Sequence, residues 1–142
     1  MDWYNLTQED RPLILIADDS PLSLKVVAEI LGGESYRIAL ADSGSAALDF
    51  IAKTRPDLIL LDIVMPDVDG FEVCRRLKES PGSASIPVIF LTGHADSLSI
   101  TRCYNMGGVD CITKPFNPAE IQAKVKNHLE LALLKNGNGS SR

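Results

Sequence analysis

The amino-acid sequence predicts an α/β fold: a doubly wound, five-stranded parallel sheet with helices on both faces. Five short apolar runs alternate strictly along the chain with five amphipathic stretches. This alternation is typical of parallel sheets built from right-handed β–α units. Three of the runs are almost continuously apolar, as strands covered on both faces are. For five strands we expect the spatial order 2-1-3-4-5.

The expected strands are short, and most of them end at a polar residue. The almost continuously apolar ones are 13–17 (LILIA), 57–62 (DLILLD) and 86–92 (IPVIFLT). The second run in chain order, 36–41 (YRIALA), alternates more in polarity, which favours an edge strand. The fifth run is 109–113 (VDCIT).

The stretches that follow these runs have helical periodicity. The expected helices span 22–31, 45–54, 70–79, 95–106 and 119–134. In the last of them, Ile121, Val125 and Leu129 form one apolar stripe, whereas the fourth is less clearly amphipathic. Ser43 and Ser45 are both candidate caps for the second helix.

Composition limits the class of protein. The chain has 142 residues, of which 45% are hydrophobic and 23% charged, as expected for one soluble globular domain. Its net charge of −5, without a cluster of Lys or Arg, argues against nucleic-acid binding. No apolar run is long enough to span a bilayer, and the N-terminus lacks the apolar core of a signal peptide. Three cysteines without C-x-x-C spacing indicate reduced thiols, so we expect a cytoplasmic protein.

The chain is expected to divide into three parts. Residues 1–11 form a polar leader, and 12–134 form the folded domain. Residues 135–142 are rich in Gly, Asn and Ser, which predicts a flexible tail or a truncated linker to a missing domain. Leu131 and Leu134 lie off the apolar stripe of the last helix. They indicate a coiled-coil lead into another domain, a dimer seam or simply an apolar helix end.

Polar groups gather at one edge of the predicted sheet. In open parallel sheets, ligands bind beyond the carboxyl ends of the strands, where the strand order reverses. Asp18 and Asp19 follow the first strand, and Asp62 ends the third. Thr92 ends the fourth strand, and Lys114 follows the fifth. We therefore expect three carboxylates, a hydroxyl and an amine to converge there.

Three carboxylates at one point need compensating charge. Two unit charges about 4 Å apart repel by roughly 4 kcal/mol at an effective dielectric constant of about 20. Lys114 supplies one positive charge, and a divalent cation would balance the remainder. Because every ligand would be an oxygen atom, the site favours Mg²⁺, with Mn²⁺ as the alternative, over zinc.

This arrangement predicts phosphoryl chemistry. A carboxylate beside Mg²⁺ can attack a phosphoryl group and form an acyl phosphate, while the metal and Lys114 neutralise the transferring oxygens. Asp62 is the best candidate nucleophile because it stands alone on the central strand. Asp18 and Asp19 are better placed to hold metal, and the Thr92 hydroxyl can donate a hydrogen bond to the bound phosphoryl group. The following turn, MPDVDG, leads the chain away and leaves the site open.

The motifs ILIADDS, LILLDIVMPDVDGFEVCRRL, IPVIFLTG and GGVDCITKPF, in this order, closely resemble the receiver domains of two-component response regulators. The resemblance runs from about Leu13 to about Leu133. It implies a flavodoxin-like fold and a phosphoprotein of phosphorelay signal transduction. Asp62 would accept the phosphoryl group from a histidine kinase or a histidine phosphotransfer protein. Thr92 would then move toward that group, and Lys114 would pair with it.

The resemblance also implies the metal ligands and the output. Asp19, Asp62 and the backbone carbonyl of Val64 would bind Mg²⁺ directly, and Asp18 would bind it through a water molecule. The protein would catalyse only its own phosphorylation and dephosphorylation, and it would regulate an output domain or a partner. A homodimer through the fourth helix, fifth strand and fifth helix is a further expectation.

One position departs from the family pattern. Receiver domains commonly carry Tyr, Phe or His three residues before the lysine, and that ring moves inward with the threonine. Cys111 stands there in this chain. Its thiol is too small to sweep the same volume, so either another residue carries the output coupling or the protein signals by another route. The departure leaves the expected phosphorylation chemistry unchanged.

Two other functions remain open. A phosphatase that passes through an aspartyl phosphate would need an acid–base Asp two residues after the nucleophile, where Val64 stands. A receiver-like docking module that is never phosphorylated would not need the complete set of acids, hydroxyl and amine.

Overall fold

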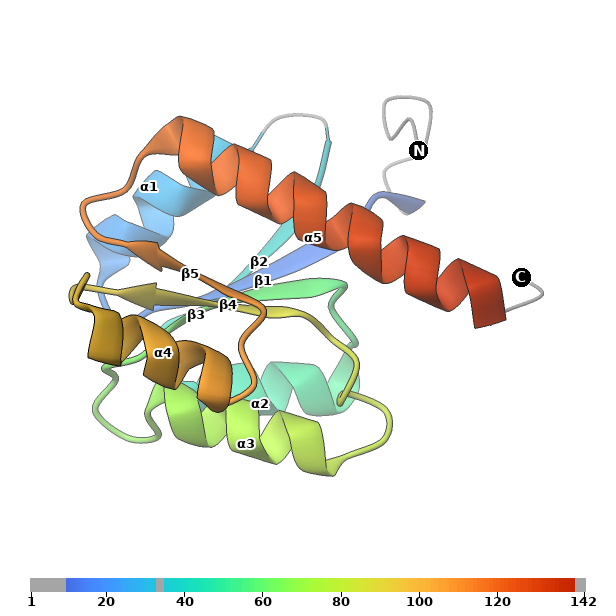
Figure 1. The fold of residues 1–142 in the computed structure, drawn as a ribbon, viewed down its shortest axis with the longest axis horizontal. Helices are drawn as coiled ribbons and strands as arrows, with labels where there is room; N and C mark the ends of the chain where they lie inside the picture. The colour runs from blue at the N-terminus through green and yellow to red at the C-terminus, as the bar shows by residue number, and fades with distance from the viewer. Residues whose placement is uncertain (1–9, 33–34, 140–142) are drawn as a thin grey trace.

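The computed structural model of the protein describes residues 10–32 and 35–139. Strands and helices alternate along them as the sequence predicts (Figure 1). In chain order they are β1 (Leu13–Ala17), α1 (Pro21–Leu31), β2 (Arg37–Ala41), α2 (Gly44–Lys53), β3 (Leu58–Asp62), α3 (Gly70–Glu79), β4 (Val88–Thr92), α4 (Ser97–Asn105), β5 (Asp110–Thr113) and α5 (Pro118–Gly139).

The five strands form one parallel sheet in the order β2-β1-β3-β4-β5, which confirms the predicted order. The strand order reverses between β1 and β3. Strand β2 lies on one side of β1, and β3, β4 and β5 follow on the other side. In the register of the sheet, Asp62 lies beside Leu91 and Thr92 lies beside Thr113. The carboxyl ends of these strands therefore reach the same edge.

The helices cover both faces of the sheet, so the protein has two apolar cores. Helices α1 and α5 lie on one face, and α2, α3 and α4 lie on the other (Figure 1). Along β1, Ile14 and Ile16 pack in the core beneath α1 and α5, whereas Leu15 and Ala17 pack in the opposite core. Every residue of β1, β3 and β4 is buried. This explains why these strands lack a polar face in the sequence.

The edge strand and the helix caps follow from local chemistry. Strand β2 is only partly buried, as predicted for an edge. Ser43 accepts a hydrogen bond from the amide of Ala46 at 3.0 Å, so it caps α2, and Ser45 lies within the helix. Asp69 caps α3 and Asp96 caps α4, each through its carboxylate. Helix α4 therefore begins later than the sequence pattern suggests.

The last helix differs most from the prediction. Helix α5 continues to Gly139 and projects beyond the sheet (Figure 1), whereas the sequence pattern predicts a helix that ends at residue 134. The flexible tail or truncated linker expected over 135–142 lies partly outside the described residues and stays a prediction. Extending an existing helix adds a hydrogen bond for each residue fixed, whereas starting a helix is costly. A weak helical sequence can therefore continue from a stable one. Leu131 and Leu134 are exposed, and the leader expected at 1–11 lies almost entirely outside the described residues.

Membrane insertion of a helix requires both length and apolar content. None of the helices in the described part of the chain meets both conditions.

Gly70 is expected to be essential for packing α3 against the end of β3. Its amide donates to the carbonyl of Ile63 at 2.8 Å, and a Cβ at this position would overlap the carbonyl oxygen of Asp62. Gly70→Ala should therefore lower the free energy of unfolding by about 2 kcal/mol or more. Gly82→Ala is the matched control, because its Cβ would meet no atom within 4 Å. Equal stability of the two variants in urea denaturation would contradict this packing argument.

Candidate functional site

Three carboxylates meet at the edge where the strand order reverses. Asp62 is the last residue of β3, and Asp18 and Asp19 directly follow β1. One ligand oxygen from each of the three lies within 4.8 Å of the others. Asp18 and Asp62 are buried, whereas Asp19 is exposed. The structure thus brings together the acids that the sequence placed at this edge.

Lys114 places its amine between the two buried acids. Its Nζ lies 3.1 Å from Oδ2 of Asp18 and 3.4 Å from Oδ1 of Asp62. The backbone amide of Lys114 donates to the carbonyl of Thr92 at 2.8 Å, which continues the β4–β5 pairing to the site. The bond from Lys114 to Pro115 is a cis peptide.

The charges at this edge shift the pKa values of its groups. Burial raises the pKa of Asp62, and the neighbouring charge of Asp18 raises it further; Lys114 opposes both effects, and the result is a pKa of about 6. Burial lowers the pKa of Lys114, but the hydrogen bond to Asp18 and the charge of Asp62 outweigh burial and leave it above its usual value. One lysine therefore does not fully compensate the acids.

A cavity of about 420 Å³ opens over these residues. Asp62, Lys114 and Thr92 line it, so the carboxylate of Asp62 can be reached by a ligand from solvent. Phe71 of α3 and Arg102 of α4 also line it, and the guanidinium lies 4.5 Å from the centre of the Phe71 ring. The lining of the cavity thus also includes an aromatic surface with a positive charge beside it.

The Thr92 hydroxyl lies at the predicted edge but bonds to the loop that follows β4. It accepts a hydrogen bond from the amide of His94 at 3.0 Å and contacts the carbonyl of His94 at 3.4 Å. Thr92 is buried, whereas His94 is exposed. The hydroxyl therefore bridges the end of β4 to the segment that leads into α4.

Val64 lies in the turn after β3, lines the cavity and is 71% exposed to solvent. The same turn contains Asp67. Asp67 accepts hydrogen bonds from the amides of Gly44, Ser45 and Val68 at 3.1, 3.1 and 2.7 Å. A hydrogen bond from the Ser45 side chain, together with these backbone contacts, holds the pKa of Asp67 well below its usual range. Asp67 thus ties the turn beside the site to the start of α2.

The sequence did not identify the cavity-lining residues that the helices supply, and Asp18 has a further contact beside the site. Ser20 caps α1, and Asp18 accepts a hydrogen bond from the Ser20 amide at 2.9 Å. Phe71, Ser99 and Arg102 could not be identified from strand ends, because they reach the cavity from helices.

Comparison with known proteins places this geometry in a family. A model of the response regulator receiver domain matches residues 14–126. The signal receiver domain of a signal transduction histidine kinase from Syntrophus aciditrophicus is 35% identical, with a TM-score of 0.73 over 92% of this chain and 93% of that one. Chemotaxis response regulator CheY4 of Vibrio cholerae is 26% identical, with a TM-score of 0.78 over 82% of this chain and 98% of that one.

Two curated relatives are longer than this chain. A Vibrio cholerae protein named "Probable cyclic di-GMP phosphodiesterase" is 38% identical over 89% of this chain and 29% of its own length. DNA-binding response regulator MtrA of Mycolicibacterium smegmatis is 35% identical over 84% of this chain and 51% of its own length. The chain thus spans about half or less of the curated relatives. The predicted flavodoxin-like fold is confirmed, and the chain belongs to the response regulator receiver domain family, whose members act in phosphoacceptor signalling.

Proposed function

We propose that Asp62 accepts a phosphoryl group from the phosphohistidine of a histidine kinase or a histidine phosphotransfer protein, in a reaction that requires Mg²⁺. The phosphorylated state then regulates an output domain or a partner protein. One observation carries this proposal: the carboxylate of Asp62 both lines the open cavity and lies 3.4 Å from the amine of Lys114. Asp18 shares the amine but is fully buried, and Asp19 is exposed.

Asp62 would act as the nucleophile. Its carboxylate oxygen attacks the phosphorus atom, and a phosphorus–oxygen bond forms as the phosphorus–nitrogen bond of the donor breaks. The imidazole leaves with the electron pair of that bond, and Asp62 becomes an acyl phosphate. The ionised carboxylate is the reactive form, so a pKa of about 6 still leaves most molecules reactive at neutral pH.

The acids fit a magnesium site. Their ligand atoms are all oxygen and lie within 4.8 Å of one another, as a hard divalent cation requires. Asp19, Asp62 and the carbonyl of Val64 would bind it directly. Asp18, which has one oxygen 3.1 Å from Nζ of Lys114, would bind through water, as the resemblance to receiver domains implies. When bound, Mg²⁺ would supply positive charge to the phosphoryl oxygens.

Lys114 and Thr92 would respond to the new phosphoryl group. The amine of Lys114 carries a raised pKa, so it stays charged at neutral pH and would pair with a phosphoryl oxygen. The Thr92 hydroxyl would leave the backbone of His94 and donate to another phosphoryl oxygen. That movement would release the segment between β4 and α4, which provides a conformational signal.

The chain would be a signalling phosphoacceptor, even though one relative carries the name of a phosphodiesterase. The match covers only 29% of that relative. We infer that this chain catalyses only its own phosphorylation and dephosphorylation, and that any enzymatic output belongs to another domain or partner.

Replacing the nucleophile should abolish phosphorylation. Asp62→Asn is expected to form no acyl phosphate with acetyl phosphate and Mg²⁺, because an amide oxygen is a poor nucleophile. Intact mass spectrometry would detect the added phosphoryl group. Asp42→Asn is the matched control, since Asp42 directly follows β2 and is exposed. Phosphorylation of Asp62→Asn at the wild-type level would refute the assignment.

Removing an exposed ligand should weaken metal binding. Asp19→Asn is expected to raise the Mg²⁺ dissociation constant by about tenfold or more, because a neutral amide replaces a charged oxygen ligand. Isothermal titration calorimetry would measure the change, again with Asp42→Asn as the control. An unchanged dissociation constant for Asp19→Asn would exclude Asp19 from the ligand set.

Placing Asp62 in a buried position beside Asp18 should also lower the free energy of unfolding, by an amount that depends on pH. Because the pKa of Asp62 is raised from 3.8 to about 6 in the folded protein, the folded state binds more protons than the unfolded state between these values. The contribution of Asp62 to the free energy of unfolding therefore falls as the pH rises through this window. Without divalent cations, the free energy of unfolding of Asp62→Asn should exceed that of the wild type by about 1–3 kcal/mol above pH 6.

The difference between the two proteins should shrink toward zero as the pH falls to about 4, because protonated Asp and Asn are both neutral. Urea denaturation at a series of pH values would measure it. A difference that does not change with pH would show that the Asp62 carboxylate is not destabilised by its neighbours.

A further inference from the structure

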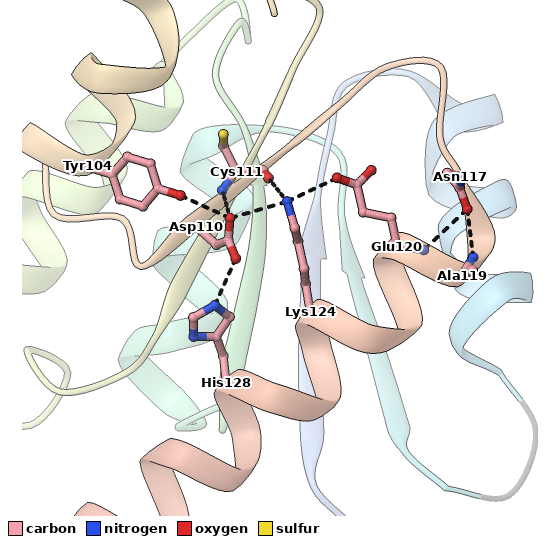
Figure 2. Close-up of polar contacts among 8 residues, drawn as sticks. All are labelled: Tyr104, Asp110, Cys111, Asn117, Ala119, Glu120, Lys124 and His128. Atoms are coloured by element: carbon pink, nitrogen blue, oxygen red, sulfur yellow. Dashed lines mark hydrogen bonds and ion pairs between the residues drawn. The ribbon is translucent and has the colours of Figure 1, made fainter. Parts of the chain in front are cut away.

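The carboxylate of Asp110 joins α4, β5 and α5 on one face of the protein (Figure 2). From α4, the Tyr104 hydroxyl donates to Oδ1 at 3.1 Å. From α5, Nε2 of His128 lies 2.9 Å from Oδ2, and Nζ of Lys124 lies 3.3 Å from Oδ1. The backbone amide of Cys111 in β5 donates to Oδ1 at 2.8 Å. One side chain thus contacts three elements.

Asp110 is held firmly by β5 and α5. Burial raises its pKa, but the hydrogen bonds from His128 and from the Cys111 amide, with the charge of Lys124, outweigh burial and keep the pKa below its usual value. Lys124 is itself fixed, because its amine donates to the carbonyl of Cys111 at 2.9 Å and pairs with Glu120 at 3.0 Å (Figure 2). The carboxylate is therefore a rigid, charged acceptor.

Helix α4 reaches this acceptor through one hydroxyl. Tyr104 lies near the end of α4 and is 47% exposed to solvent. The other end of α4 follows the segment that the Thr92 hydroxyl holds through His94. Helix α4 is thus connected at its start to the threonine of the site and at its end to Asp110.

The side chain of Cys111, beside this contact, is too small to transmit a conformational change by moving. Cys111 is 6% exposed and packs in the same core as Cys103 of α4. Its thiol fills little volume compared with an aromatic ring. Tyr104 is the aromatic residue that links α4 to β5 in the described structure.

We propose that the Tyr104–Asp110 hydrogen bond is a latch that holds α4 in the unphosphorylated arrangement and opens when Asp62 is phosphorylated. This inference rests on the proposed phosphoacceptor function. A contact made in one of two states favours that state by its own free energy. Opening the latch would free the Tyr104 hydroxyl and part of the Asp110 carboxylate, so a partner could recognise both.

Tyr104→Phe tests the latch, because it removes only the hydroxyl. The probe is beryllofluoride with saturating Mg²⁺, which mimics the phosphoryl group on Asp62, and amide chemical shifts of α4 and β5 report binding. We expect the half-saturating beryllofluoride concentration to fall about two- to tenfold, as the loss of one hydrogen bond from the unswitched state predicts. Binding of Mg²⁺ alone should not change.

Two further variants separate the latch from a general effect. Tyr36→Phe removes a hydroxyl just before β2, the strand at the opposite edge of the sheet from β5, and should bind beryllofluoride like the wild type. In an Asp110→Ala background, Tyr104→Phe should have no additional effect, because the bond is already absent.

The outcomes distinguish the two proposals. If the wild type responds to beryllofluoride and Tyr104→Phe has the same or a higher half-saturating concentration, the latch is wrong and the phosphoacceptor function stands. Additive effects of Tyr104→Phe and Asp110→Ala would also overturn the latch. If the wild type itself shows no response, the phosphoacceptor function fails and the latch fails with it.

Discussion

The pairing of Lys114 with the buried carboxylates of Asp18 and Asp62 is the interaction on which the site depends. Lys114 and Asp18 are 96 positions apart in the chain, and only the order of the sheet brings them together. Backbone pairing of β1 with β3 and of β4 with β5 sets the distances between these strand ends. The apolar strands, buried on both faces, therefore stabilise an arrangement of charges that would repel one another in a less rigid framework.

This arrangement is unfavourable for stability and favourable for chemistry. A buried carboxylate beside a second acid costs free energy that an apolar side chain at the same place would not. The raised pKa of Asp62 is a measure of that cost. The same uncompensated negative charge would favour the divalent cation that we propose, and the open cavity over Asp62 would give the proposed phosphoryl donor access to the carboxylate. Perturbed groups of this kind are typical of functional sites.

Much of the fold and of the site could be predicted because backbone geometry determines them. Continuous apolar runs predicted the buried strands, and strand ends in a parallel sheet must share an edge, which placed Asp18, Asp19 and Asp62 together. The contact between Arg102 and Phe71, and the contacts of Asp110, depend on side-chain conformations and on helix packing. No period or spacing in the sequence encodes them. The end of α5 was misplaced for a related reason, since composition alone does not show how far a packed helix extends.

Helix α4 is suited to transmit a signal because it is weakly held. Of its nine residues, only Cys103 is buried, whereas α3 buries five of ten. A helix with so little buried apolar surface can shift at small cost, and local opening is expected where such contacts are few. A single hydrogen bond contributes about 1 kcal/mol, which weighs more for α4, with one buried residue, than for α3, with five. The Thr92 contacts at its start and the Tyr104 contact at its end therefore act on the element of the fold that responds to them most.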